Sequence, residues 1–354
     1  MKFAVKLFLA VLLVLGRLNQ IPAVEAAGPE MLDVDNLPEW RVANSTYGGK
    51  LLLSDSPEMV TADGILYQDQ VDGMARLFFY HVNATDTAKR LEVILENRGP
   101  EVAHVAVRQH GLGGPGYIWM AVGKDAVTSY LACRQSYQVS VPAKGSMPLA
   151  GGIGDTAVLP NMLVNGIFDI VADRPVTVKV LQMPLFADSG EFSRKAPILP
   201  PDEPHLRGTF EGANRRLVPL TIFDPEHDSA IAMTLADNQI DPYLVGVDAT
   251  DNSKVVNYGN YGVVYRIFLP SKKIGQFACY LAPIGGDYAG SIGIKYRNVD
   301  QDPVATPPAR LSFGGDGASD FALLGIFNAH EPLWLTFSPP GGSNLPVRIV
   351  VLPQ

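Results

Sequence analysis

Short apolar segments separated by glycine and proline turns constrain the fold of this chain more than any other feature. The 354 residues include 34 glycines and 28 prolines, and only 18% are charged. Segments such as Leu91–Glu96 and Val176–Val180 alternate apolar and polar side chains and are bounded by turn residues. This spacing is typical of β-sandwiches. The chain is longer than most single cores, so two domains are expected.

The sequence therefore predicts a mainly β fold of two tandem antiparallel β-sandwich domains, immunoglobulin-like or jelly-roll-like, over residues 47–190 and 205–354. Four prolines between residues 197 and 204 predict a linker over residues 191–204. Residues 27–46 lack a strand pattern and are expected to form an irregular leader. The turn at Asn97–Pro100 predicts a hairpin between the strands on either side of it.

One helix is expected inside the first domain, over residues 117–133. Apolar residues recur there at steps of three and four, which is the period of a helix. The residues that carry this period are Trp119, Val122, Ala126, Tyr130 and Cys133.

The first 26 residues have the pattern of a secretory signal peptide. Lys2 and Lys6 precede an apolar run from Leu7 to Leu15, and the small residues around Ala26 suit cleavage. As a helix, this run is too short to cross the ~30 Å core of a bilayer. We therefore expect a secreted protein, extracellular or associated with the cell surface, with no transmembrane segment.

Charge and cysteine content exclude two further classes of protein. The formal net charge of −8 disfavours binding to nucleic acid, because phosphate backbones attract basic surfaces. Cys133 and Cys279 are the two cysteines, which excludes a disulfide scaffold. Free thiols are favoured, and one bridge between the domains is the alternative.

Familiar catalytic and cofactor motifs are incomplete. Gly111–Gly116 has the three glycines of a dinucleotide loop, but the next strand, Tyr137–Val141, is not followed by the acidic residue that binds ribose. His330 and Glu331 begin a zinc-protease motif that lacks its second histidine. We therefore expect no catalytic residue, no metal and no cofactor. Two acidic groups leave calcium open as an alternative: Asp248, Asp251 and Asn252, and Asp224, Glu226 and Asp228.

Aromatic residues beside amides predict a ligand site in the second domain. Tyrosine rings can lie against sugar rings while asparagine amides supply hydrogen bonds. A tyrosine-bearing hairpin turn explains the same composition without a ligand. The expected ligand-binding residues are Tyr258, Tyr261, Tyr265, Asn257, Asn260 and Trp119.

Four stretches, Leu77–Asn83, Trp119–Lys124, Asn257–Tyr265 and Ser338–Pro346, resemble uncharacterised secreted bacterial proteins, some of which are labelled for a copper amine oxidase-like N-terminal domain. The resemblance implies an extracellular β protein. An amine oxidase also needs an Asn-Tyr-Asp/Glu motif and a His-x-His copper pair, and the chain has neither. We therefore do not transfer copper or amine oxidation.

Together, these observations predict a non-catalytic extracellular or cell-envelope-associated protein that binds a glycan or an envelope protein. An extracellular carbohydrate-active enzyme is the alternative, since β-sandwiches also host lyases and glycosidases. A calcium-stabilised adhesion module is the third interpretation.

Overall fold

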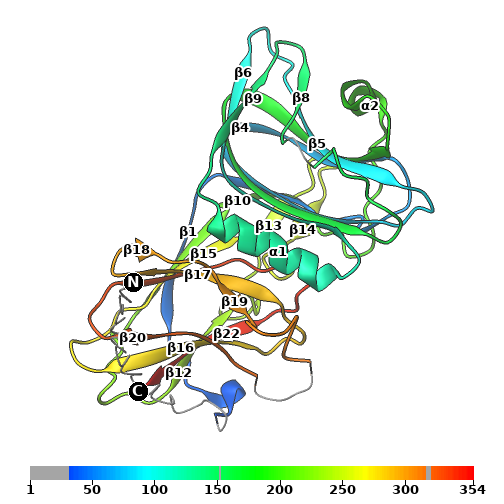
Figure 1. Ribbon diagram of the computed structural model, residues 1–354. Coiled ribbons are helices and arrows are strands. Elements are labelled where there is room, and N and C mark those ends of the chain that lie inside the picture. The colour runs from blue at the N-terminus through cyan, green and yellow to red at the C-terminus, as the bar shows by residue number, and fades with distance from the viewer. Residues whose placement is uncertain (1–31, 151–152, 316–319) are drawn as a thin grey trace, which may run out of the picture.

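The computed structural model describes residues 32–150, 153–315 and 320–354, so the expected signal peptide lies outside the described residues. The described chain is mainly β-strand, as predicted, with two α-helices, α1 (Trp119–Ala132) and α2 (Ser189–Lys195), and one 3-10 helix, η2 (Val34–Asn36). Within these residues the strands form three sheets. Figure 1 shows two halves with α1 between them.

An eleven-stranded sheet forms the upper half of the molecule in Figure 1. Its two longest strands, β4 (Gly64–Asn83) and β9 (Leu163–Pro184), pair antiparallel along most of their length. The sheet curves around an apolar core of its own. Its other strands are β2 (Lys50–Ser54), β3 (Met59–Val60), β5 (Lys89–Glu96), β6 (Ala103–Gly116), β7 (Tyr137–Val141), β8 (Ser146–Pro148), β10 (Arg207–Glu211), β13 (Val245–Val247) and β14 (Lys254–Val256).

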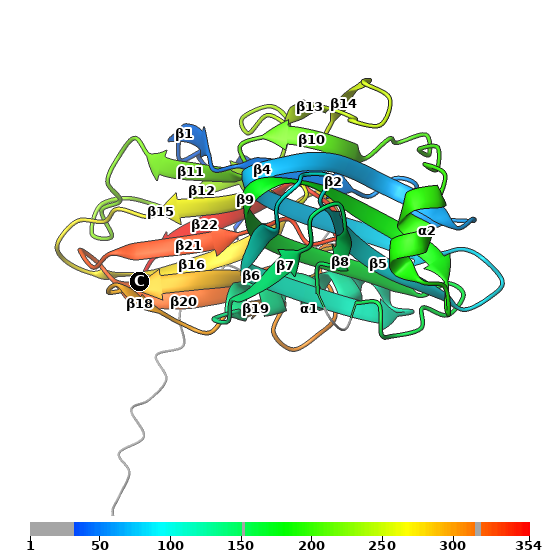
Figure 2. The same ribbon diagram turned by 90° about the horizontal axis from the view of Figure 1, so that it is seen from above.

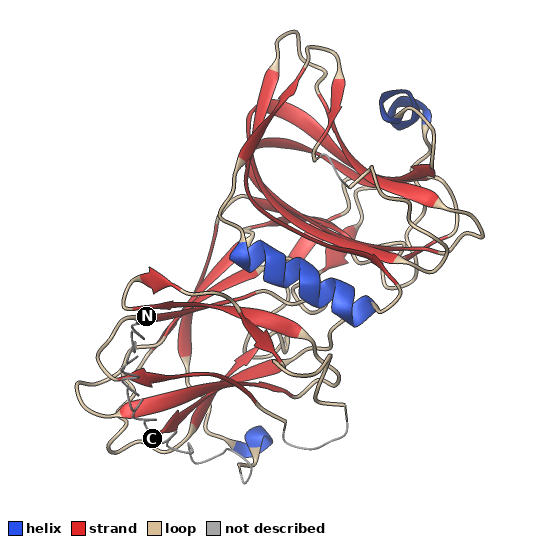
Figure 3. Ribbon diagram, viewed as in Figure 1, coloured by secondary structure: helices blue, strands red, loops and turns tan. Residues whose placement is uncertain are grey.

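The lower half consists of a seven-stranded and a four-stranded sheet that pack face to face (Figures 1 and 3). Tyr265 and Phe337 of the larger sheet share one buried cluster with Phe277 and Ile349 of the smaller. The larger sheet contains β1 (Val42–Tyr47), β11 (Asn214–Pro219), β15 (Val264–Phe268), β17 (Gly290–Tyr296), β18 (Val299–Asp300), β19 (Val304–Thr306) and β21 (Leu333–Phe337). The smaller contains β12 (Ile231–Leu235), β16 (Gln276–Pro283), β20 (Ala322–Asn328) and β22 (Val347–Pro353).

The sheets do not divide at the predicted domain boundary. Strand β10 follows the expected linker but pairs with β2, and β13 and β14 extend the same sheet. Conversely, β1 lies largely within the expected irregular leader and pairs with β11 in the lower half. Each half therefore contains strands from both sides of residues 191–204.

The expected linker is itself ordered and packed. It begins within α2, whose N-terminus is capped by Asp188, because the Asp188 carboxylate accepts a hydrogen bond from the Glu191 backbone N–H at 2.7 Å. Further along, the backbone N–H of Ile65 donates to Pro197, and that of Leu199 donates to Ile65, both at 2.8 Å. Figure 1 shows α2 in the upper half, apart from α1, and Figure 2 shows it at the end of the molecule opposite β18 and β20.

Two expectations about strand pairing are wrong. Strands β5 and β6 flank the turn at Asn97 but do not pair with each other, because each pairs with a different part of β9. The sheets are also not purely antiparallel, since β2 and β3 pair parallel with β4, and β11 pairs parallel with β15. Pairing with distant strands overrides the local turn signal.

Helix α1 confirms the helix predicted over residues 117–133. Val122, Val127 and Tyr130 are buried in a core cluster that also contains residues of both halves. The helix rests closely on β6, because a Cβ atom at Gly113 would overlap the carbonyl oxygen of Val122. The glycines of Gly111–Gly116 thus give the helix room to approach the sheet and do not form a dinucleotide loop.

Arg76 on β4 ties the two halves together from inside. Its guanidinium binds Asp169 at 2.6 Å and donates to the hydroxyl of Tyr130 on α1 at 3.0 Å. It also donates to the backbone carbonyls of Ala213 and Gly262, at 2.6 and 3.2 Å. Arg76 is 3% exposed, so these contacts replace the water that a charged group would otherwise bind.

Candidate functional site

The tyrosines expected to bind a sugar ring do not form an exposed platform. Tyr265 is fully buried, and its hydroxyl donates to Asp241 at 2.6 Å. Tyr261 is half-buried, and its hydroxyl donates to the Ser343 carbonyl at 2.8 Å. Tyr258 is 54% exposed, with its ring edge-on to Tyr243 at 6.0 Å between centroids. Of the three, only Tyr258 is exposed, and the prediction for Tyr265 is wrong because its ring is fully buried.

The amides expected to bind a ligand instead hold their own loop in place. The Asn257 side chain donates to the carbonyl of Tyr261 and accepts from its N–H, both at 2.9 Å. The Asn260 side chain accepts from the Leu244 N–H at 2.9 Å and donates to the Tyr265 hydroxyl at 3.0 Å. Both asparagines are fully buried, so the tyrosine-bearing turn explains this segment and the ligand role is wrong for them.

Trp119 lies apart from that turn, at the start of α1. It is half-buried against the shared core, and its Nε1 donates to the Asn161 carbonyl at 3.2 Å. The structure therefore does not unite the predicted residues into one site.

The four stretches that carry the resemblance meet between the two halves. The Phe78 ring lies 6.3 Å from that of Tyr261. Gly123 of α1 lies against the backbone of Gly341, which in turn lies against the ring of Tyr80. We call this region, formed by α1, residues 257–265 and residues 338–346, the seam.

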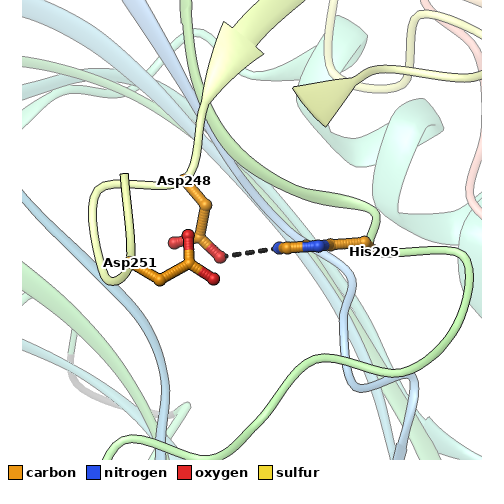
Figure 4. A group of neighbouring side chains, drawn as sticks. All are labelled: His205, Asp248 and Asp251. Carbon is orange, nitrogen blue, oxygen red and sulfur yellow. Dashed lines mark hydrogen bonds and ion pairs between the residues drawn. The ribbon is translucent and has the colours of Figure 1, made fainter. Parts of the chain in front are cut away.

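The acidic group around Asp248 is already bonded to protein side chains. Figure 4 shows His205, Asp248 and Asp251 close together, with His205 Nε2 2.9 Å from Asp248 Oδ2. Arg207 donates to the same oxygen at 2.6 Å. Burial alone would raise the pKa of Asp248, but hydrogen bonds from Thr250, Arg207 and His205 lower it below its usual value. These contacts explain the cluster without an ion.

The group around Asp224 is similar. Lys272 Nζ lies 2.8 Å and His227 Nδ1 3.0 Å from Asp224 Oδ2. Asp228 accepts a hydrogen bond from the Asp224 backbone N–H at 2.7 Å. The ligand atoms of Asp224, Glu226 and His227 lie within 4.8 Å of one another, and calcium ligation there would have to displace Lys272.

Three carboxyl groups meet beside the seam. Asp55 is 8% exposed, and its Oδ1 has no hydrogen-bond partner among the described residues. Asp202 accepts from Ser56 Oγ at 2.6 Å and from the Glu58 N–H at 2.8 Å. Burial raises the pKa of Asp55 well above its usual value, and the charges of Glu58 and Asp202 raise it further. Burial and Asp202 also raise the pKa of Glu58.

Buried phenol and imidazole groups surround these carboxyls. Burial raises the pKa of Tyr80, and the charges of Glu58 and Asp55 raise it further. His81 accepts from Ser54 Oγ at Nε2 (2.8 Å) and donates from Nδ1 to the Pro57 carbonyl (2.9 Å) when the ring is neutral. Burial lowers the pKa of His81 to about 4, which keeps the ring neutral. Ser54 and His81 are fully buried, so this pair is structural.

A polar pocket opens where the C-terminal end of α1 meets the seven-stranded sheet. Its volume is about 190 Å³, and we call it the seam pocket. Its walls come from β6 and α1 on one side and from β15, β17, β18 and β21 on the other. The polar residues that line it include Gln109, Arg134, Arg266, Lys295, Gln301 and Thr336. Sequence analysis missed this pocket, because its residues carry no motif and lie up to 227 positions apart, between Gln109 and Thr336.

Both cysteines are free, in agreement with the favoured expectation. Cys279 is buried in the lower core, whereas Cys133 is half-buried and lines the seam pocket. The Cys133 sulfur lies 3.3 Å from the Gln135 carbonyl, to which it donates, and 3.5 Å from His110 Nδ1. Cys133 therefore does not lie on a fully buried helix face.

Comparisons with known proteins assign no family. No family model matches the chain, and no curated protein matches it. Similar solved structures include an oxalate decarboxylase from Lactobacillus farciminis (11% identity, 88% of each chain, TM-score 0.14) and vicilin from tomato, Solanum lycopersicum (10% identity, 86% of this chain and 85% of that one, TM-score 0.12). Similarity at these TM-scores identifies neither a fold nor an activity. Among the described residues, no helix is long and apolar enough to cross a membrane.

Proposed function

We propose that this is a secreted, non-catalytic β-sandwich protein that binds a glycan in the seam pocket. The position and lining of that pocket support the proposal. Ligand sites form preferentially where two structural units meet, and both halves line this one. The pocket presents guanidinium, amide and hydroxyl groups. These groups can form hydrogen bonds with the hydroxyl groups of a sugar, whereas an apolar molecule has no such groups.

The size of the pocket favours a small recognition element. Pockets for drug-sized ligands measure on the order of 300–1,000 Å³. The seam pocket, at about 190 Å³, suits a single sugar residue within a longer chain.

A glycan array on the purified mature chain tests this function. Gln301→Trp is the blocking variant, because Gln301 lines the pocket and is exposed, so a large ring there fills the pocket without disturbing the core. Gln239→Trp, at another exposed loop position, is the matched control. We expect binding that weakens at least tenfold in Gln301→Trp alone. Binding that the blocking variant leaves unchanged would place the ligand elsewhere.

The carboxyl groups beside the seam favour a carbohydrate-active enzyme as the second candidate. Glycosidases use a pair of carboxyl groups, one of which has a raised pKa and acts as the acid. Asp55 and Glu58 lie three positions apart, and burial raises the pKa of both. A polysaccharide-degradation screen tests this candidate. Turnover by the wild type that is lost in Asp55→Asn and Glu58→Gln, but not in the exposed control Asp86→Asn, would replace the non-catalytic proposal.

A further inference from the structure

We propose that the seam pocket recognises a negatively charged group of its ligand, a carboxylate or a phosphate, through Arg266 and Arg134, which both line it. This inference rests on the proposed function and specifies its ligand class. Three observations support this proposal: the position of Arg266 on the sheet, the lack of carboxylate partners for the arginines, and the space that the pocket leaves beside them.

The register places two arginines next to each other on the sheet. Arg216 of β11 is the direct partner of Arg266 of β15 in a parallel pair, so both side chains lie on the same face. Thr336 continues the row on β21, and Gly293 follows on β17. The two side chains then diverge, because Arg216 lies over Tyr47 on β1 whereas Arg266 donates to Thr336 on β21, and of the two only Arg266 lines the seam pocket.

No carboxylate of the described chain neutralises these arginines. Arg266 donates to Thr336 Oγ1 at 2.7 Å, and Arg134 donates to the backbone carbonyls of Leu131 and Cys133 at 2.8 and 3.1 Å. Arg216 stands over the ring of Tyr47, with its guanidinium carbon 5.5 Å from the centroid. None of the three arginines forms an ion pair within the described residues, although the chain carries a net charge of −8.

The one carboxylate in the pocket lining is already engaged. Asp300 Oδ2 lies 3.6 Å from Lys295 Nζ, and both side chains are exposed. The opposite charges of Asp300 and Lys295 cancel, so Arg134 and Arg266 give the pocket lining a net positive charge. The pocket is therefore a positive site on an acidic protein, which favours the approach of an anion.

The seam pocket leaves room for the anion next to Arg266. Leu131 of α1 and Thr336 lie over the position where Gly293 lacks a side chain, so the space for the anion is the seam pocket itself, which Arg266 and Gly293 both line. A planar guanidinium binds a carboxylate or a phosphate through two parallel N–H donors. Arg266 is half-buried, and one of its guanidinium nitrogens donates to Thr336. This hydrogen bond fixes the side chain, and its other N–H donors stay free for a ligand.

Calorimetric titration with three probes tests the inference: an oligogalacturonate, the same oligosaccharide as its neutral methyl ester, and inorganic phosphate. The variants are Arg266→Gln and Arg134→Gln. Arg108→Gln is the matched control, because Arg108 is exposed on β6 outside the pocket and the change in charge is the same.

We expect an anionic probe to bind, the methyl ester to bind at least tenfold more weakly, and affinity to fall as salt rises. Arg266→Gln should weaken binding at least tenfold, while Arg108→Gln should stay within twofold of the wild type. Tighter binding of oligogalacturonate assigns a carboxylate, and tighter binding of phosphate assigns a phosphate group.

Equal binding of the ester, or no effect of Arg266→Gln, would overturn the anionic ligand class. So would the failure of both anionic probes. If Gln301→Trp still abolishes glycan binding on the array, the proposed function survives that result. Absence of binding in both experiments overturns both proposals.

Discussion

Gly123 in helix α1 lies directly against the backbone of Gly341, in the loop that follows β21. A Cβ atom at Gly123 would overlap the Gly341 carbonyl oxygen, so this helix can dock at the seam only because the position is glycine. The contact joins two segments that lie more than 200 residues apart in the sequence.

The first prediction follows from this contact. Glycine to alanine in a helix normally stabilises by about 1 kcal/mol. At Gly123 we expect the opposite sign, a loss of about 1–3 kcal/mol, because the backbone of residue 341 must move. Chemical denaturation measures the change. Gly190→Ala in α2 is the control, since a Cβ there meets only movable side-chain atoms, and it should not destabilise. A Gly123→Ala variant that is more stable than the wild type would show that α1 is not tightly packed against residue 341.

The second prediction concerns Arg76, whose guanidinium contacts both halves of the molecule. Arg76→Met leaves Asp169 and several carbonyls without their buried partner, so we expect a loss of about 3–5 kcal/mol in the free energy of unfolding. The matched change Arg98→Met breaks an exposed pair with Glu96 and should cost only about 0–1 kcal/mol. Similar losses for the two variants in urea denaturation would contradict a seam held by Arg76.

The third prediction is a dependence on pH through Asp55. Its folded pKa is raised, so Asp55 contributes most to stability below its unfolded pKa, and this contribution is lost as the pH rises through the folded value. Asp55→Asn mimics the protonated acid and should therefore raise the melting temperature at pH 8, with a smaller effect near pH 4. Asp86→Asn is the exposed control. A variant that is less stable than the wild type at pH 8 would refute the raised pKa.

The fourth prediction separates the two thiols. Cys133 is half-buried and lines the seam pocket, so it should react with a thiol reagent in the folded protein. Cys279 is fully buried, and burial raises the pKa of its thiol, so it should react only after unfolding. Mass spectrometry of the labelled protein reads both outcomes. A need for reductant before either cysteine reacts would show that they pair.

Sequence patterns predicted the features that depend on local periodicity. Helix α1 follows from apolar residues at steps of three and four, and the aromatic run over Ala75–Val82 indicates a strand, which the structure has as part of β4. On β4, Leu77 and Phe79 face the core of the upper half, whereas Phe78 and Tyr80 belong to the shared cluster at the seam. A strand that is buried on both faces has a continuous run of apolar residues, so the sequence indicates the strand but not the strands that pair with it.

Features that depend on distant pairing could not be predicted. The composition of residues 257–265 suits a sugar site, but Tyr265 lies on β15 inside a sandwich and Asn260 supports its hydroxyl. Tyr265 is buried because strands that are distant in the sequence pack around it. The Arg216 and Arg266 pair likewise follows only from the register of β11 and β15. Neither residue belongs to a recognisable motif.

The pairing of β2 with β10 has a consequence for how the protein is made. As the polypeptide is synthesised, β2 emerges long before β10, so one edge of the eleven-stranded sheet has no neighbour until the region beyond residue 205 has appeared. An unpaired edge is a template for association with other chains. In the nascent chain the upper sheet thus stays incomplete beside β2, and its final closure waits for the second half of the polypeptide.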